Sequence, residues 1–287
     1  SYDRIHEFTL DRFDLVREEV RALMPGARKD RIITKDDFKQ ARRRALFIDD
    51  ADRFDTIARL PANGSRGKRL DKAMAALERE SESLVDVLPK DYERLPDDLL
   101  GDLLRAFDDP DLARVGDDDI GRIYEYFLQK FALTGAQEGG EFFTPPSLVR
   151  LIVGLIEPRA GRVYDPACGS GGMFVHTGHF LEMEKIDPAI VTFVGREKSP
   201  LNTRLARMNL AVHGLSHKPV QGDNSYFPTE DPYVGDCEFV MANPPFNVDG
   251  VPLAKVRDDP RLQFGIPSLA SDERTISNGN YLWIQYF

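Results

Sequence analysis

The chain of 287 residues contains few cysteines and no long hydrophobic run. Its two cysteines, Cys168 and Cys237, form neither a CxxC pair nor a disulfide framework, which favours a reducing intracellular setting over a secreted one. We expect both to be small buried side chains and not nucleophiles. No stretch approaches the ~20 apolar residues of a membrane-spanning helix, and no signal peptide is visible. We therefore expect neither a secreted nor a membrane protein.

Residues with the spacing of a metal site are also lacking. His176 with His179, and His213 with His217, form pairs without further ligands at zinc spacing, so we predict structural roles for them. The acidic run over residues 97–119 includes no histidine or cysteine, which favours solvated helix faces and N-caps. The sequence therefore predicts no metal site.

Positive charge is in deficit. Lysine and arginine number 38 against 48 aspartates and glutamates, which gives a net charge of -10. Phosphate binding depends on lysine and arginine, so a protein that grips nucleic acid alone over a wide face is disfavoured. Residues 28–44 are a local exception, with eight basic residues against three aspartates. This segment fits either a solvated helix face or a patch for nucleic acid.

The pattern of hydrophobic residues divides the chain into two domains, as its length allows. Leu70, Met74, Leu77 and Leu84 recur at helical spacing, and residues 120–131 repeat this pattern. Breaks fall at residues 60–64 and 109–110, and a glycine-rich connector occupies residues 135–140. We predict a helical domain over residues 1–135 and a second domain over residues 136–287.

The second domain alternates short apolar strands with helices, which predicts a parallel, doubly wound α/β sheet. Helices are expected after Gly171, over residues 201–212 and at the end of the chain. A four-stranded sheet with an exposed apolar edge is an unusual place for a fold to end, so we expect a fragment of a longer polypeptide. The expected strands are residues 162–164, 190–194, 219–221 and 239–242.

The end of the last predicted strand carries the most informative motif, Asn243-Pro244-Pro245-Phe246. Proline cannot donate to a sheet ladder, so the strand stops and leaves the Asn243 side chain at its carboxyl edge. Ligands bind at this edge in open α/β sheets. An asparagine amide, a proline carbonyl and an aromatic ring together suit a flat group that carries an exocyclic NH₂.

A glycine-rich turn follows the first predicted strand and opens a helix, in the sequence Asp165-Pro166-Ala167-Cys168-Gly169-Ser170-Gly171-Gly172. Glycines allow a ligand to approach the backbone, and a helix N-terminus favours an anionic group. The glycine spacing does not fit the GxGxxG dinucleotide fingerprint. Taken alone, the segment fits a flexible turn equally well.

Two further acidic residues follow the second and third predicted strands. Glu197 is placed to accept hydrogen bonds from both hydroxyls of a ribose, and Asp223 to accept one from an adenine amino group. Either acid alone fits a helix N-cap equally well. Polar residues at successive strand ends, from Asp165 through Glu197 and Asp223 to Asn243, favour one ligand site at a common sheet edge.

In this order, DPACGSGGMF, GREKSP, GD and NPPF resemble motifs I to IV of S-adenosylmethionine-dependent DNA methyltransferases that act on amino groups. Residues 141–145, EFFTP, resemble the family's motif X, which contacts the methionine end of the cofactor. Together with residues 123–128 and 130–132, this context resembles the methylation subunit of type I restriction-modification systems. The resemblance runs from about residue 60 to the end. Asn224-Ser225 departs from it, because many relatives carry an apolar residue there that packs on the cofactor's adenine.

The resemblance implies a helical N-terminal domain followed by a Rossmann-like methyltransferase domain that is truncated at its C-terminus. It implies catalytic roles for Asn243, Pro244, Pro245 and Phe246. Its implied cofactor-binding residues are Phe143, Thr144, Pro145, Asp165, Ala167, Gly169, Ser170, Gly171, Gly172, Glu197 and Asp223.

The activity that the resemblance implies is site-specific methylation of adenine N6 in DNA, with S-adenosyl-L-methionine as cofactor and a flipped adenine as target. The implied partners are double-stranded DNA, a DNA specificity subunit, a restriction subunit with motor and nuclease functions, and a second copy of the methylation subunit. The implied location is the cytoplasm of a bacterium or archaeon, with no membrane involved.

Three alternatives remain open. The same motif serves glutamine methylation of release factors and guanine-N2 methylation of RNA, although the helical first domain disfavours both. A non-catalytic assembly fragment is the third reading, against which the intact Asn243 and Phe246 argue. Site residues alone do not separate these substrates.

Overall fold

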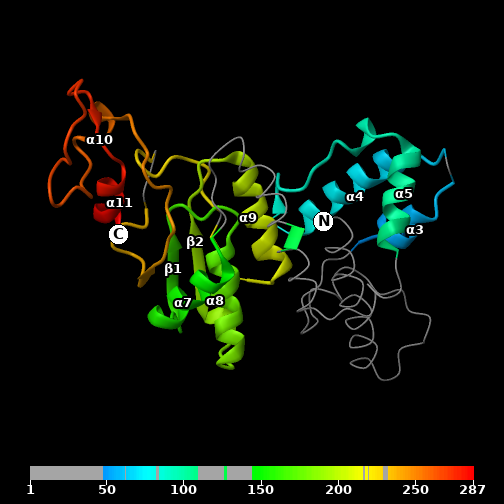
Figure 1. Ribbon diagram of the computed structural model, residues 1–287. Coiled ribbons are helices and arrows are strands. Elements are labelled where there is room, and N and C mark those ends of the chain that lie inside the picture. Colours follow the sequence, from blue (N-terminus) through cyan, green and yellow to red (C-terminus); the bar gives the residue numbers. More distant parts are fainter. Residues whose placement is uncertain are drawn as a thin grey trace. The chain divides into compact units, whose positions relative to one another are not determined.

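The computed structural model describes residues 48–61, 63–81, 84–108, 126–127, 144–215, 217–218, 220–228 and 232–287 (Figure 1). The chain divides into two compact units, Ser1–Tyr126 and Phe127–Phe287. The basic segment 28–44, the proposed boundary between residues 135 and 136, and nearly all of the run 120–131 lie outside the described residues.

The first unit is helical in its described part, as the hydrophobic spacing predicts. Leu70, Met74 and Leu77 are buried on one face of α4, which makes this helix amphipathic. Leu84 is buried too, but α4 ends at Glu80, so the prediction that Leu84 shares its face is wrong. The described elements are η1 (Asp50–Asp52), α3 (Phe54–Ala58), α4 (Arg66–Glu80), η3 (Tyr92–Arg94) and α5 (Asp97–Phe107).

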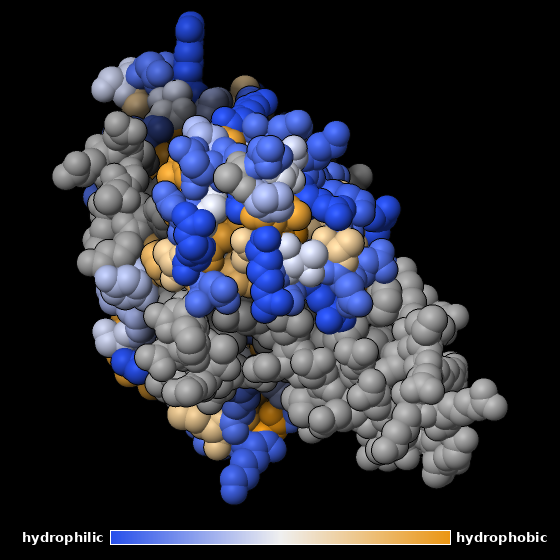
Figure 2. Space-filling model, turned by 90° about the vertical axis from the view of Figure 1, so that its right-hand side faces the viewer, coloured by the Kyte–Doolittle hydropathy of each residue, from blue (hydrophilic) through white to orange (hydrophobic). Residues whose placement is uncertain are grey.

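Acidic side chains tie the elements of this unit together. Asp97, the first residue of α5, accepts hydrogen bonds from the backbone and guanidinium of Arg66 at the start of α4, both at 2.6 Å. Asp71 accepts from the backbone N–H of Tyr92 at 2.9 Å. Asp97 therefore begins the predicted acidic run with an interhelical contact. Figure 2 views the molecule from the right-hand side of Figure 1. On this face, hydrophobic residues are interspersed with hydrophilic ones.

The second unit is built on a parallel sheet with the strand order β2-β1-β3. The strands are β1 (Gly161–Asp165), β2 (Val191–Gly195) and β3 (Phe239–Val240). β1 pairs in parallel with both neighbours, and Val163 is opposite Phe193 on one side and Phe239 on the other. This central position brings the end of β1 between the ends of β2 and β3.

The third predicted strand is only partly formed. Two isolated parallel bridges, Phe193 with His217 and Arg196 with Gln221, place this segment on the outer side of β2. A proline within the predicted strand has no N–H to donate, which limits regular pairing there. Pro219 itself lies outside the described residues. The polar residues that follow this segment still reach the same edge as those that follow β1 and β2.

Helices cover the sheet and enclose its core. α7 (Pro146–Ile156) packs beside α8 (Gly172–Met183), and α9 (Pro200–Val212) follows η5 (Pro188–Ile190) and β2 (Figure 1). The β1-α8-β2-α9 order confirms the predicted alternation of strands and helices. The core includes Val149, Val153, Val163, Phe174, Leu181, Phe193, Leu210 and Met241.

A second hydrophobic cluster forms near the carboxyl ends of the strands. β4 (Val251–Pro252) and β5 (Thr275–Ile276) pair antiparallel, α10 (Leu253–Val256) lies between them in sequence, and α11 (Asn280–Tyr286) confirms the predicted final helix. Tyr226 and Trp283 are buried in this cluster, and Ala167 packs against it. The segment after β3 therefore forms one wall of the strand-end region. No helix in the described part of the chain is long and apolar enough to span a membrane.

Candidate functional site

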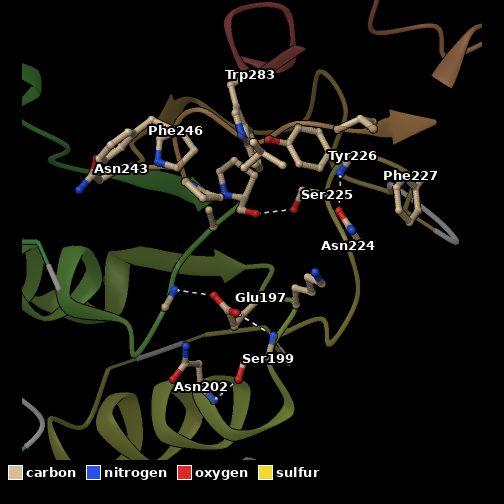
Figure 3. Close-up of a pocket in the computed structure, with 18 of the residues that line it drawn as sticks. Glu197, Ser199, Asn202, Asn224, Ser225, Tyr226, Phe227, Asn243, Phe246 and Trp283 are labelled. Atoms are coloured by element: carbon tan, nitrogen blue, oxygen red, sulfur yellow. Dashed lines mark hydrogen bonds between the residues drawn. The ribbon is translucent and has the colours of Figure 1, made fainter. Parts of the chain in front are cut away.

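A cavity of about 650 Å³ opens at the carboxyl edge of the sheet (Figure 3). Its walls come from the segments that follow β1, β2 and β3, from residues 224–227, and from Trp283 of α11. The predicted residues at this cavity are Ala167, Gly169, Glu197, Asn243, Pro244, Pro245 and Phe246. Residues 77 positions apart (Ala167 and Pro244) thus share one cavity, as the parallel topology predicts.

Other predicted site residues are not among the described residues that line the cavity. Asp165 ends β1, Ser170 and Gly171 lie in the turn that follows it, Gly172 begins α8, and Asp223 pairs with Arg196. Thr144 and Pro145 precede α7, and Phe143 lies outside the described residues. Their predicted contacts with a cofactor remain predictions.

The backbone conformation favours glycine in the turn after β1. Gly169 has φ +54° and Gly171 has φ +83°, a left-handed conformation that side chains rarely adopt. Apart from the neighbouring residues and the backbone of α8, no heavy atom lies within 4 Å of a Cβ placed on Gly169 or Gly172, so the backbone there faces open space. Gly171 is the N-cap of α8. The turn therefore offers bare backbone to a ligand.

Asp165 is hydrogen-bonded to this turn. Its carboxylate accepts a hydrogen bond from the Ala167 N–H at 2.9 Å, and the residue is 1% exposed. Burial raises the pKa of Asp165 to about 7; the Ala167 hydrogen bond opposes this shift, and the negative charge of Glu197 adds to it. Asp165 thus supports the turn, and the protonation state of its carboxyl changes near neutral pH.

The raised pKa of Asp165 predicts a stability that falls with pH. Its folded-state pKa of about 7 exceeds the ordinary value of 3.8, so between these values the folded state holds a proton that the unfolded state has lost. Stability from this group is full below pH 4 and decreases as the pH rises through 7. In Asp165→Asn, whose amide oxygen still accepts from Ala167, this decrease should be absent.

Urea unfolding from pH 5 to pH 8 measures this effect. The stability of Asp165→Asn relative to the unmodified chain should increase from pH 5 to about pH 7 and then level off, because above the folded-state pKa both states have lost the proton. Asp187→Asn is the matched control, because Asp187 is an exposed aspartate that caps η5. Parallel pH profiles for Asp165→Asn and the unmodified chain would show that Asp165 does not titrate in this range.

Glu197 connects the turns after β1 and β2. One carboxylate oxygen accepts from the Gly169 N–H at 3.0 Å, and the other accepts from the Ser199 N–H at 2.7 Å (Figure 3). Each oxygen has a second lone pair, so these bonds are compatible with further donors from a ligand. The Ser199 side chain in turn accepts from the Asn202 N–H and caps the start of α9. Glu197 is therefore a fixed carboxylate in the cavity wall.

Asp223 has a partner that the sequence did not suggest. The guanidinium of Arg196, which is fully buried, donates to the Asp223 carboxylate, and its Nε lies 3.4 Å from the Tyr164 hydroxyl. The side chain of Asp223 is 28% exposed. A buried arginine needs such an anionic partner. Asp223 therefore neutralises Arg196, and its contact with an adenine amino group remains a prediction.

Asn243 and Phe246 lie at the opposite side of the cavity from residues 224–227 (Figure 3). The Asn243 Nδ2 donates to the Thr144 hydroxyl at 3.1 Å. Phe246 is 54% exposed and lines the cavity. The motif thus presents an amide and a ring at the mouth of the cavity.

Three aromatic residues of the cavity were missed by sequence reasoning. Tyr226 and Trp283 pack with ring centroids 5.0 Å apart, and the Lys255 ammonium lies 4.4 Å from the centroid of the Phe227 ring. Tyr226 and Phe227 directly follow Asn224-Ser225, where an apolar residue was expected. They supply apolar surface two residues later, a shift that the motif comparison alone did not reveal.

The remaining candidates are a cysteine and several histidines, which are buried or partly buried. Cys168 is buried, and burial raises the pKa of its thiol, which therefore stays protonated at neutral pH. Burial lowers the pKa of His176 to about 4 and also lowers the pKa of His213 and His217. Among the residues that the structure describes, no group of three or more histidine, cysteine or acidic side chains is arranged to hold a metal ion.

The strand order, the glycine turn and the shared strand-end cavity define a Rossmann-like α/β domain with a ligand site at its strand ends, preceded in sequence by a helical unit. A family model described as N-6 DNA Methylase matches residues 115–287. The chain belongs to the N-6 DNA methylase family.

Individual relatives narrow this assignment. The methylase subunit of the type I restriction enzyme MjaIX from Methanocaldococcus jannaschii is 34% identical over 249 residues, covering 84% of this chain and 44% of that protein. The HindI methylase subunit from Haemophilus influenzae is 34% identical over 247 residues, covering 81% and 54%. The chain thus spans about half the length of these curated relatives. They confirm the resemblance to type I methylation subunits.

A solved structure agrees in fold. The crystal structure of the type I restriction-modification system methyltransferase subunit from Streptococcus thermophilus matches with a TM-score of 0.64 at 19% identity, covering 84% of this chain and 53% of that chain. The likeness supports the predicted fold class, a helical domain followed by a Rossmann-like methyltransferase domain.

Proposed function

We propose that this chain is the catalytic part of a DNA adenine-N6 methyltransferase subunit of a type I restriction-modification complex. The observation that carries the proposal is the single cavity that joins Gly169 and Glu197 to Asn243 and Phe246. One wall offers bare backbone and a carboxylate, and the other offers an amide and an exposed ring. Transfer of a group between two substrates requires that the binding surfaces for both lie next to each other.

The residues present fit S-adenosylmethionine as cofactor. The open backbone at Gly169 leaves room for a ligand, and the carboxylate of Glu197 in the cavity wall is an acceptor for ribose hydroxyls. Tyr226 and Phe227 offer apolar surface to an adenine ring. When bound, this cofactor supplies a sulfonium methyl group that is open to nucleophilic attack.

Asn243 and Pro244 activate the target amine in this proposal. The lone pair of an adenine NH₂ group is delocalised into the ring, which makes the nitrogen a poor nucleophile. The Asn243 Oδ1 and the Pro244 carbonyl accept its two hydrogens and favour a tetrahedral nitrogen. Fixed acceptors also stabilise the positive charge that develops on this nitrogen during attack. The contribution is positional and electrostatic, and the proton leaves after transfer.

Phe246 holds the target base outside the duplex. A base must leave the stack before its amino group can enter a cavity, and the exposed Phe246 ring offers it a stacking surface. The net charge of -10 is unfavourable for wide contact with phosphates, so the subunit requires partners for DNA binding. We infer a specificity subunit, a restriction subunit and a second methylation subunit as partners, with cytoplasmic DNA as substrate.

Methylation assays with DNA, RNA and protein acceptors test the substrate class. The complete polypeptide that contains this chain, assembled with its partner subunits, should transfer labelled methyl groups from S-adenosylmethionine to double-stranded DNA alone. Transfer confined to protein or to RNA would overturn the proposal and support the glutamine or guanine alternatives. Absence of both cofactor binding and transfer would support a non-catalytic role.

A further inference from the structure

Thr144 and Asn243 are 99 residues apart in sequence and are in direct contact. The Asn243 Nδ2 donates to the Thr144 Oγ1 at 3.1 Å. Thr144 belongs to the EFFTP motif before α7, whereas Asn243 lies in the chain that follows β3. The contact therefore connects two motifs that the sequence assigned to different tasks, cofactor binding and catalysis.

The direction of this hydrogen bond matters because the two ends of an asparagine amide differ. Nδ2 only donates and Oδ1 only accepts. An amine that donates its hydrogens to acceptors needs Oδ1, because Nδ2 in the same place is itself a donor. In the structure the Thr144 hydroxyl accepts from Nδ2, and this contact leaves Oδ1 for the amine.

Thr144 directly precedes a helix start that is held in place. The carbonyl of Pro145 accepts from the N–H groups of Leu148 at 2.9 Å and Val149 at 3.1 Å, which begins α7. Val149 and Val153 anchor α7 in the core of the sheet. Asn243, by contrast, is exposed. The Thr144 hydroxyl thus connects an exposed side chain to a helix that is anchored in the core.

We propose that Thr144 is a positioning residue for methyl transfer, whose hydroxyl orients the Asn243 amide toward the target amine. This inference rests on the proposed function of Asn243. It differs from the cofactor contact that the resemblance implies for Thr144. A positioning residue affects the rate of transfer at saturating cofactor, whereas a cofactor contact affects cofactor affinity.

The test uses the complete polypeptide with its partner subunits and compares Thr144→Val with Thr144→Ser. Valine keeps the shape of threonine without its hydroxyl, and serine keeps the hydroxyl. The readouts are the single-turnover methylation rate at saturating cofactor and DNA, and the Kd for S-adenosylmethionine by calorimetry. Thr177→Val is the matched control, because the Thr177 hydroxyl bonds to the Met173 carbonyl within α8 at 2.8 Å.

We expect Thr144→Val to lower the single-turnover rate about tenfold or more, because a displaced acceptor loses its alignment with the amine. Thr144→Ser and Thr177→Val should stay within about threefold of the unmodified enzyme, which corresponds to less than one net hydrogen bond. All variants should bind the cofactor with unchanged Kd.

Several outcomes would overturn the inference. An unchanged rate in Thr144→Val would show that the hydroxyl does not orient Asn243. A weakened Kd with an unchanged saturating rate would assign Thr144 to the cofactor. Equal slowing by valine and serine would indicate a packing role. Failure of the unmodified enzyme to methylate DNA would instead count against the proposed function, so the two failures are distinguishable.

Discussion

Replacement of Asn243 by alanine is expected to lower the rate of methyl transfer at least about 100-fold and to leave cofactor affinity unchanged. Loss of one preorganised polar group that faces developing charge typically costs about 10² to 10³ in rate. Asn243 is exposed at the cavity mouth, so its removal leaves no void in the core. Single-turnover kinetics and calorimetric titration with S-adenosylmethionine measure the two quantities separately.

Asn278→Ala is the matched control for this prediction. Asn278 lies in the same unit, and its side-chain oxygen accepts from the Asn280 N–H at 2.8 Å. It is not among the described residues that line the cavity. It should methylate DNA at nearly the unmodified rate. Equal losses of rate and cofactor affinity in Asn243→Ala would mean that Asn243 supports the fold of the site and does not act on the amine.

Replacement of Glu197 by alanine should weaken S-adenosylmethionine binding by about 10- to 100-fold, because hydrogen bonds to a charged group contribute about 1.5–3 kcal/mol. The variant loses the carboxylate toward the ribose and also the acceptors for Gly169 and Ser199. Transfer at saturating cofactor should fall much less than affinity does. Calorimetry gives the Kd, and single-turnover rates give the second quantity.

Two comparisons separate the ligand contact from the support of the turns. Glu197→Gln keeps one acceptor oxygen, so its affinity should lie between those of the alanine variant and the unmodified protein. Glu182→Ala removes an exposed glutamate from α8 and controls for the change in net charge. Unchanged cofactor affinity in Glu197→Ala would rule out the ribose role.

The sequence predicted the sheet edge well because its polar residues follow strands that are recognisable by their apolar runs. In a parallel sheet those strand ends meet, so Gly169, Glu197 and Asn243 had to come together. The third strand was harder to predict. Its pairing is reduced to two bridges, and the strand pattern alone does not report how many ladder bonds form.

Contacts between side chains from distant segments could not be predicted. Nothing in the sequence indicates that Arg196 is fully buried against Asp223, since lysine and arginine normally remain exposed. Nor does it indicate that Thr144 meets Asn243, or that Trp283 of the last helix packs on Tyr226. Such pairs depend on how loops cross the sheet edge, which local patterns do not determine.

Mass analysis of nucleosides from methylated DNA tests the central claim most directly. Unmethylated duplex DNA would be incubated with S-adenosylmethionine and the complete polypeptide in its assembly, then digested, with Asn243→Ala treated in parallel. The account predicts N6-methyladenine from the unmodified enzyme and at least about 100-fold less from the variant. Methylated cytosine or guanine in its place, or equal N6-methyladenine from the variant, would contradict it.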